Sequence, residues 1–164
     1  MAMQHTPLLM SKIIDRGAKV APNEEIVTAT QNGVRRQTYK ETRDRAHQLA
    51  HALSESGIAV GDRVGTFMWN GSRHLEAYQA CAGMGAVLHT LNIRLSEKDL
   101  EYIINHAEDQ IIIVDADILP LLEKLEGKMP TVRQVVIATE EGFEGWSTQL
   151  PNAVDYQDFI KDKP

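Results

Sequence analysis

At 164 residues, with 43% apolar and 24% charged side chains, the chain has the length and composition of one soluble globular domain. The formal net charge is −6, and the acidic residues are spread along the sequence. Arg35-Arg36 and the Arg43/Arg45 pair are too isolated to form the basic face of a nucleic-acid-binding protein. A single cysteine excludes an intramolecular disulfide, and no apolar run approaches the roughly 18 residues of a transmembrane helix, so we expect a cytoplasmic protein.

The first elements predicted along the chain are a helix and a hairpin. Thr6-Pro7 is typical of a helix N-cap followed by proline, and the sequence predicts a helix over about residues 7–19. Two β-prone runs, 26–29 and 34–39, flank Asn32-Gly33, the kind of pair that a type I′ turn prefers. We therefore expect a β-hairpin after the first helix.

A capping box marks the next helix. Thr38 and Glu41 are spaced so that each side chain can bond to the backbone N–H of the other. The apolar residues that follow recur at i, i+3, i+4 and i+7, namely Ala46, Leu49, Ala50 and Leu53. Gly57 stands where a residue ending a helix is expected.

Short strands and helices alternate in the rest of the chain. The predicted strands are 63–69, 86–90, 111–114 and 135–137. The predicted helices begin at Ser72 and Ser96, and two short ones cover Leu119 to Leu125 and, after a loop over 139–153, Val154 to Lys161. The helix from Ser96 repeats the i, i+3, i+4, i+7 spacing with Leu100, Ile103, Ile104 and Ala107. This alternation predicts an α/β fold: a mostly parallel, doubly wound sheet flanked by helices, with the hairpin as an antiparallel addition.

Two motifs look functional but lack essential parts. Gly83-Met84-Gly85 follows a predicted helix instead of a strand, and Leu88 occupies the third glycine position of a dinucleotide-binding turn. His47 and His51 have the i, i+4 spacing of zinc ligands, but Gln48 stands where the general-base glutamate belongs, and no third ligand is evident. We interpret the glycines as ending a helix and the histidines as a solvated flank, and we predict no metal site.

Polar and aromatic side chains gather at the ends of two predicted strands. Trp69 and Asn70 end one of them, and His89 and Asn92 end another. Because parallel strands present their carboxyl ends to one crevice, these four residues are candidates for binding a small molecule. A structural interpretation, in which the tryptophan fills a core and the asparagines satisfy loop backbone, fits the sequence equally well.

Two further side chains carry possible chemistry. Asp115 ends the β-branched run Ile111–Val114 and is followed closely by Asp117. It is a possible site residue or phosphoacceptor, although turn chemistry favours an aspartate that caps a turn or helix. Cys81 lies among small apolar neighbours, and we expect a buried, unreactive thiol.

Four segments, in their order along the chain, carry a resemblance to a known family. They are Thr38–Glu41, Val60–Asn70, Gly83–Ser96 and Tyr102–Asp109, with Gly85-Ala86-Val87-Leu88-His89-Thr90-Leu91-Asn92 the most specific part. The chain resembles the N-terminal part of AMP-forming acyl-CoA synthetases of the adenylate-forming superfamily, closest to medium- and long-chain fatty-acid–CoA ligases. The resemblance runs from about Thr6 to Ile137.

The resemblance implies a whole enzyme that joins a fatty acid to CoA through an acyl-adenylate, using ATP and Mg²⁺ and releasing AMP and pyrophosphate. The family's Ser/Thr/Gly-rich phosphate loop, its adenine and ribose motifs and its C-terminal lysine are absent from this sequence. No catalytic residue is therefore carried over, and the segment alone is expected to be inactive and to bind no cofactor. Residues 1–164 are expected to form a partial N-terminal domain with a scaffold role, part of the acyl side, and a homodimer contact.

Two other interpretations remain open. One is a stand-alone, non-catalytic α/β module that binds a ligand or dimerises. The other is a receiver-like signalling domain with Asp115 as phosphoacceptor, which calls for an early acidic pair and a late strand followed by lysine. Asp44 and Asp62 are badly placed for that pair, and no such lysine is evident.

Overall fold

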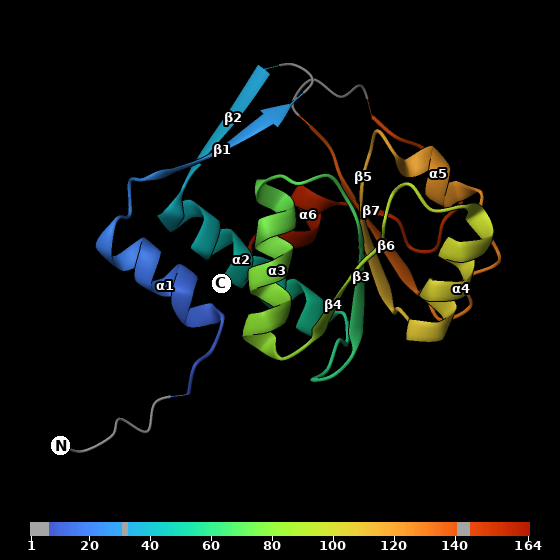
Figure 1. The fold of residues 1–164 in the computed structure, drawn as a ribbon, viewed down its shortest axis with the longest axis horizontal. Helices are drawn as coiled ribbons and strands as arrows, with labels where there is room; N and C mark the ends of the chain where they lie inside the picture. Colours follow the sequence, from blue (N-terminus) through green and yellow to red (C-terminus); the bar gives the residue numbers. More distant parts are fainter. Residues whose placement is uncertain (1–6, 31–32, 141–144) are drawn as a thin grey trace.

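In the computed structural model, which describes residues 7–30, 33–140 and 145–164, a parallel five-stranded sheet forms the centre of the chain (Figure 1). Its order is β4-β3-β5-β6-β7, and all four pairings are parallel. The strands are β3 Arg63–Phe67, β4 Val87–Thr90, β5 Ile111–Asp115, β6 Gln134–Ala138 and β7 Val154–Asp155. Helices lie in the connections from β3 to β4, from β4 to β5 and from β5 to β6, the usual crossover between parallel strands.

Helices cover both faces of the sheet, which confirms the doubly wound α/β architecture (Figure 1). One layer contains α2 Tyr39–Glu55, α3 Ser72–Met84 and α6 Tyr156–Ile160, and the other contains α4 Glu97–Ala107 and α5 Leu119–Glu123. The central strand β5 explains the arrangement, because successive side chains of a strand point to opposite faces. Ile111 and Ile113 join the core under α2 and α3, whereas Ile112 and Val114 join the core under α4 and α5.

The capping box at the start of α2 is confirmed. The Thr38 hydroxyl accepts a hydrogen bond from Glu41 N–H at 3.1 Å, and the Glu41 carboxylate accepts one from Thr38 N–H at 2.8 Å. Leu49 and Leu53 of the predicted apolar stripe are fully buried. Gly57 follows the helix with a φ of 82°, a left-handed conformation that favours glycine at this position.

A separate two-stranded hairpin, β1 Glu25–Thr30 and β2 Gly33–Thr38, precedes α2 and stands apart from the main sheet (Figure 1). The predicted hairpin is confirmed, but the predicted turn residues are not both in the turn. Gly33 pairs with Thr30 and therefore belongs to β2, and Asn32 lies outside the described residues.

Three predicted boundaries are wrong. The first helix, α1, runs over Ser11–Val20 instead of about residues 7–19, and its predicted cap residue Thr6 lies outside the described residues. The side chains just before it are exposed, so no tertiary packing extends the helix toward Pro7. Strand β3 ends at Phe67, which leaves Trp69 in the following loop. Residues Val154 and Asp155 form β7 instead of opening the last helix, because they pair with β6.

The helices of the described ranges all lack the length and apolar character that a membrane span requires.

Candidate functional site

A cavity of about 930 Å³ lies at the carboxyl ends of the parallel strands. Its floor comes from residues at the ends of three strands: Met68 and Trp69 after β3, Asp115 at the end of β5, and Ala138 at the end of β6. The hairpin and the first turn of α3 complete the walls. This is the position at which open parallel sheets bind small molecules.

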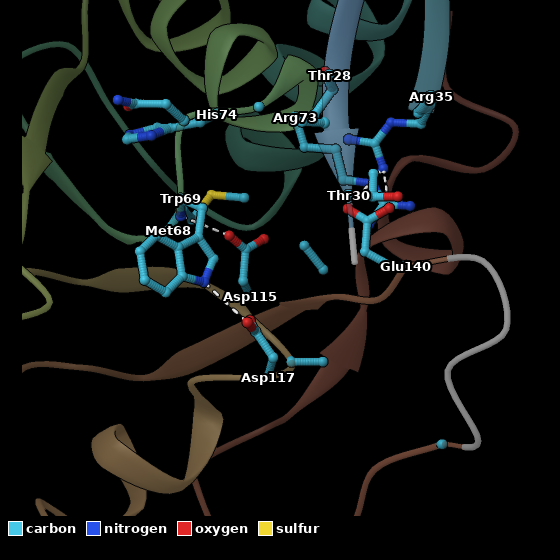
Figure 2. Close-up of a pocket in the computed structure, with 16 residues that line it drawn as sticks. Thr28, Thr30, Arg35, Met68, Trp69, Arg73, His74, Asp115, Asp117 and Glu140 are labelled. Atoms are coloured by element: carbon cyan, nitrogen blue, oxygen red, sulfur yellow. Dashed lines mark hydrogen bonds and ion pairs between the residues drawn. The ribbon is translucent and has the colours of Figure 1, made fainter. Parts of the chain in front are cut away.

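Trp69 is held at the cavity by two carboxylates (Figure 2). Its backbone N–H donates to Asp115 Oδ2 at 2.7 Å, and its indole N–H donates to Asp117 Oδ2 at 2.9 Å. The side chain is still 49% exposed, so one part of the indole remains open to the cavity mouth. The loop after β3 is thereby tied to the loop after β5.

Burial dominates the electrostatics of Asp115. Desolvation raises the pKa of this carboxyl to about 7, and the nearby Asp117 carboxylate adds to the increase. The hydrogen bond from Trp69 N–H and the Arg73 guanidinium act in the opposite direction. Asp115 is therefore a carboxyl group on the cavity wall that changes its charge near neutral pH.

The hairpin forms one wall of the cavity and is fastened to two other elements. Arg35 of β2 donates from Nη1 to both carboxylate oxygens of Glu140, at 2.8 and 2.7 Å, and from Nε to Ser72 Oγ at 3.2 Å. Thr28 of β1 accepts from the Ser72 N–H at 3.1 Å and so satisfies a backbone donor at the start of α3. Gly71 permits this approach, because a Cβ there would lie 3.2 Å from Thr28 Cγ2.

Two side chains from the first turn of α3 also reach the cavity (Figure 2). Arg73 donates to the Thr139 carbonyl and lies 3.8 Å from Glu140 Oε1. Burial and the Arg35 guanidinium lower the pKa of Arg73. His74 is buried with Nε2 3.0 Å from Thr66 Oγ1, and burial lowers its pKa, so the imidazole stays neutral near pH 7.

The four residues predicted at the strand ends do not form one group. Trp69 and Asn70 line the cavity. His89 lies on the edge strand β4, with Nδ1 2.8 Å from the buried carboxylate of Asp109. Asn92 accepts a hydrogen bond from the backbone N–H of Arg94 at 3.0 Å and thus shapes its own turn.

The structure also places Asp115, Cys81 and His47, the other side chains that the sequence singled out. Within the part of the chain that the structure describes, the Asp115 carboxylate holds the Trp69 loop instead of capping a turn or helix. Cys81 is buried, as expected, and desolvation raises the pKa of its thiol to about 12, which disfavours the reactive thiolate. His47 Nε2 lies 3.6 Å from Asp15 Oδ1. Within residues 7–30, 33–140 and 145–164, no group of three or more His, Cys, Asp or Glu side chains could hold a metal ion.

Sequence reasoning missed the charged group of Arg35, Arg73 and Glu140. These residues come from the hairpin, from α3 and from the segment after β6. The sequence presents Arg35 only as half of the Arg35-Arg36 pair, and no local pattern marks any of the three. Only the tertiary fold brings them together.

Comparisons with known proteins identify relatives along nearly the whole chain. The family model described as AMP-binding enzyme matches residues 14–163. A long-chain-fatty-acid–CoA ligase of Thermus thermophilus is 43% identical over 145 residues, covering 88% of this chain and 27% of the relative. A medium-chain-fatty-acid–CoA ligase of Ectopseudomonas oleovorans is 35% identical over 159 residues, covering 96% of this chain and 29% of the relative. The chain thus spans less than a third of the length of these curated relatives.

Solved structures support the same fold at lower sequence identity. The anthranilate CoA ligase AuaEII superposes with a TM-score of 0.80 at 24% identity, covering 100% of this chain and 30% of that one. A Mycobacterium tuberculosis fatty acyl CoA synthetase superposes with a TM-score of 0.70 at 24% identity, covering 77% of this chain and 26% of that one.

Proposed function

Because this chain belongs to the family of AMP-binding enzymes, we propose that it forms the N-terminal part of an AMP-forming ligase that joins medium- or long-chain fatty acids to CoA. In the proposed reaction the fatty acid and ATP give an acyl-adenylate and pyrophosphate, and the CoA thiol then displaces AMP. The observation that carries the proposal is the 43% identity to a long-chain-fatty-acid–CoA ligase over 88% of the chain.

Within that enzyme we assign the cavity at the strand ends to the acyl side. Its apolar wall includes Met68, Trp69, Ala116 and Ala138, which suits a hydrocarbon chain better than a strongly hydrated ligand. Asn70 lines the same cavity and remains a candidate contact. His89 and Asn92 lie away from it, so a substrate contact by them requires a different surface of the enzyme.

The cavity does not fit a magnesium triphosphate. Its two guanidinium groups, those of Arg35 and Arg73, are already bound to Glu140 and to the Thr139 carbonyl. The described residues also lack a converging set of metal-binding side chains, whereas Mg²⁺ needs near-octahedral oxygen ligands. We therefore place the binding of ATP, Mg²⁺ and CoA outside this cavity and derive no step through them.

A scaffold and dimerisation role completes the proposal. The exposed apolar side chains of α1 and the segment before it include Leu9, Met10, Ile13 and Val20. On β4, which is an edge strand in the described sheet, Val87 is also exposed. Apolar patches and open strand edges both favour association, which supports a homodimer contact in this region.

The exchange of pyrophosphate into ATP tests the catalytic part of the proposal. The 164-residue chain should stay at background with fatty acids from octanoate to palmitate, because it lacks the phosphate loop and lysine of the family. The Thermus thermophilus ligase serves as the positive control in the same assay. Clear turnover by the chain alone contradicts the assignment.

Sedimentation velocity over a tenfold dilution series tests the dimerisation role. We expect one discrete dimer if the contact belongs to the enzyme, and a distribution of larger species if only exposed strand edges associate. A single monomer boundary at every concentration contradicts the proposed dimer contact.

A further inference from the structure

We propose that Asp115 sets the charge of the strand-end cavity in response to pH, so that an apolar anion binds more tightly when this carboxyl group is protonated. The inference rests on the proposed function, because it concerns the acyl-side cavity and the carboxylate head group of its ligand. It adds a pH dependence of ligand binding, which follows from the way in which the charged side chains of this cavity are paired.

The first observation is that the cationic groups of the cavity are committed to a different carboxylate. Arg35 holds both oxygens of Glu140, and Arg73 lies 3.8 Å from the same side chain. Among the described residues, the hydrogen bond recorded for the Asp115 carboxylate comes from Trp69 N–H, a neutral donor. Ionised Asp115 is therefore a half-buried anion with no bound guanidinium.

The second observation concerns every charged group that faces Asp115. Asp117 follows it in the same loop, Arg73 reaches it from α3, and Glu140 approaches from the segment after β6. Arg35 of the hairpin lines the same cavity. When all five groups are ionised, three carboxylates face two guanidiniums and the net charge is −1. Protonation of Asp115 brings this net charge to zero.

The third observation separates Asp115 from the other titratable side chain of the cavity. Burial raises the pKa of Asp115 to about 7, whereas burial lowers the pKa of His74 below its usual 6.5. We therefore attribute a change in the net charge of the cavity between about pH 6 and pH 8 to the titration of Asp115. Removing its negative charge weakens the repulsion of an anionic head group inside the cavity.

The size of the effect follows from Coulomb's law. An anionic head group about 8 Å from Asp115, at an effective dielectric constant of about 40, binds about fivefold more weakly when Asp115 is ionised. A neutral ligand of the same length loses nothing by this mechanism. The comparison between an anionic and a neutral ligand is therefore diagnostic.

The experiment uses the 164-residue chain with Trp146→Phe, which leaves Trp69 as the only indole. Octanesulfonate stays anionic throughout the pH range, and 1-octanol is its neutral counterpart. Binding of each is followed through the NMR resonance of the Trp69 indole N–H. Because Asp115 is only partly titrated at either end of this range, we expect the Kd of octanesulfonate to rise about threefold from pH 6 to pH 8, and the Kd of octanol to stay constant.

Two variants complete the test. Asp115→Asn should bind octanesulfonate at pH 8 as tightly as the parent does at pH 6, without pH dependence. Asp158→Asn removes one exposed carboxylate on α6, outside the cavity, and should retain the parental dependence. The comparison of the two ligands on the parent chain remains decisive even if Asp115→Asn does not fold.

The inference is overturned if octanesulfonate binds equally at both pH values, if octanol shows the same change, or if the dependence persists in Asp115→Asn. In these cases the ligands still bind, and the assignment of the cavity to the acyl side stands. If neither ligand shifts the Trp69 resonance at any pH, that assignment falls together with the inference.

Discussion

Replacement of Glu76 tests how the elements around the site are held together. This side chain lies on α3 and is fully buried. Its Oε1 accepts hydrogen bonds from Gln37 Nε2 and Arg45 Nε, each at 2.8 Å, and its Oε2 accepts one from the Tyr156 hydroxyl at 2.6 Å. One carboxylate thus joins the hairpin, α2 and α6 to α3.

The expected cost comes from the groups that Glu76→Leu would leave without a partner. Arg45 and Tyr156 stay in place, because the Arg45 guanidinium also lies over the Tyr156 ring, 5.7 Å from its centre. Removing one member of a buried charged network costs about 3–5 kcal/mol of unfolding free energy. Glu76→Gln should cost less, about 1–2 kcal/mol, because the Tyr156 hydroxyl can turn to accept from the new amide.

Urea unfolding followed by circular dichroism measures both losses. Glu97→Leu is the matched control, since it breaks an exposed ion pair with Lys124 at 3.2 Å and should cost less than about 1 kcal/mol. The reasoning is refuted if Glu76→Leu lowers the unfolding free energy no more than Glu97→Leu does, while the m-value of urea unfolding stays unchanged.

Three further predictions concern packing and pH. Ile104→Asp should unfold the chain in thermal melts, because it places a charge where a fully buried side chain contributes about 1.5–3 kcal/mol; a parental melting temperature contradicts this. Gly65→Ala should cost about 1–3 kcal/mol in urea, since its Cβ would lie 3.1 Å from Asp109 Oδ2, and an unchanged midpoint contradicts the packing. The folded pKa of Asp115 exceeds its unfolded value, so the folded state holds the proton more tightly, and the contribution of this group to the unfolding free energy should fall as pH rises from 3.8 to about 7. Parallel urea titrations of the parent and of Asp115→Asn isolate this contribution, and a difference between the two that stays constant over this range contradicts the assignment.

The local parts of the fold could be predicted because their causes lie within a few residues. Thr38 and Glu41 define the start of α2 by direct reciprocal bonds. The β-branched run of β5 requires apolar cover on both faces, and this places helices on both sides of the sheet. Strand β7, by contrast, has two residues, too few for a pattern, and forms only because β6 offers it an edge.

The sequence could predict only those residues of the site that follow the end of one strand. Trp69 and Asn70 follow shortly after β3 and line the cavity, whereas the Arg35–Glu140 pair depends on a contact across 105 residues. His89 lies on the edge strand β4, beside the strand that Trp69 follows, and there its Nδ1 contacts the Asp109 carboxylate instead of the cavity. Glu76 lies beside Ala77 on the buried face of α3, which only the tertiary structure defines.

A chimera of the Thermus thermophilus long-chain-fatty-acid–CoA ligase tests the central claim most directly. Residues 1–164 of this chain replace the matching segment of that ligase, and fatty-acid-dependent formation of AMP in the presence of CoA is measured. We predict an active chimera, and we predict that the same chimera carrying Glu76→Leu loses most of its folded fraction and its activity. A chimera that folds with a cooperative melt and still forms no AMP with any fatty acid contradicts the proposal that this chain is the N-terminal part of such an enzyme.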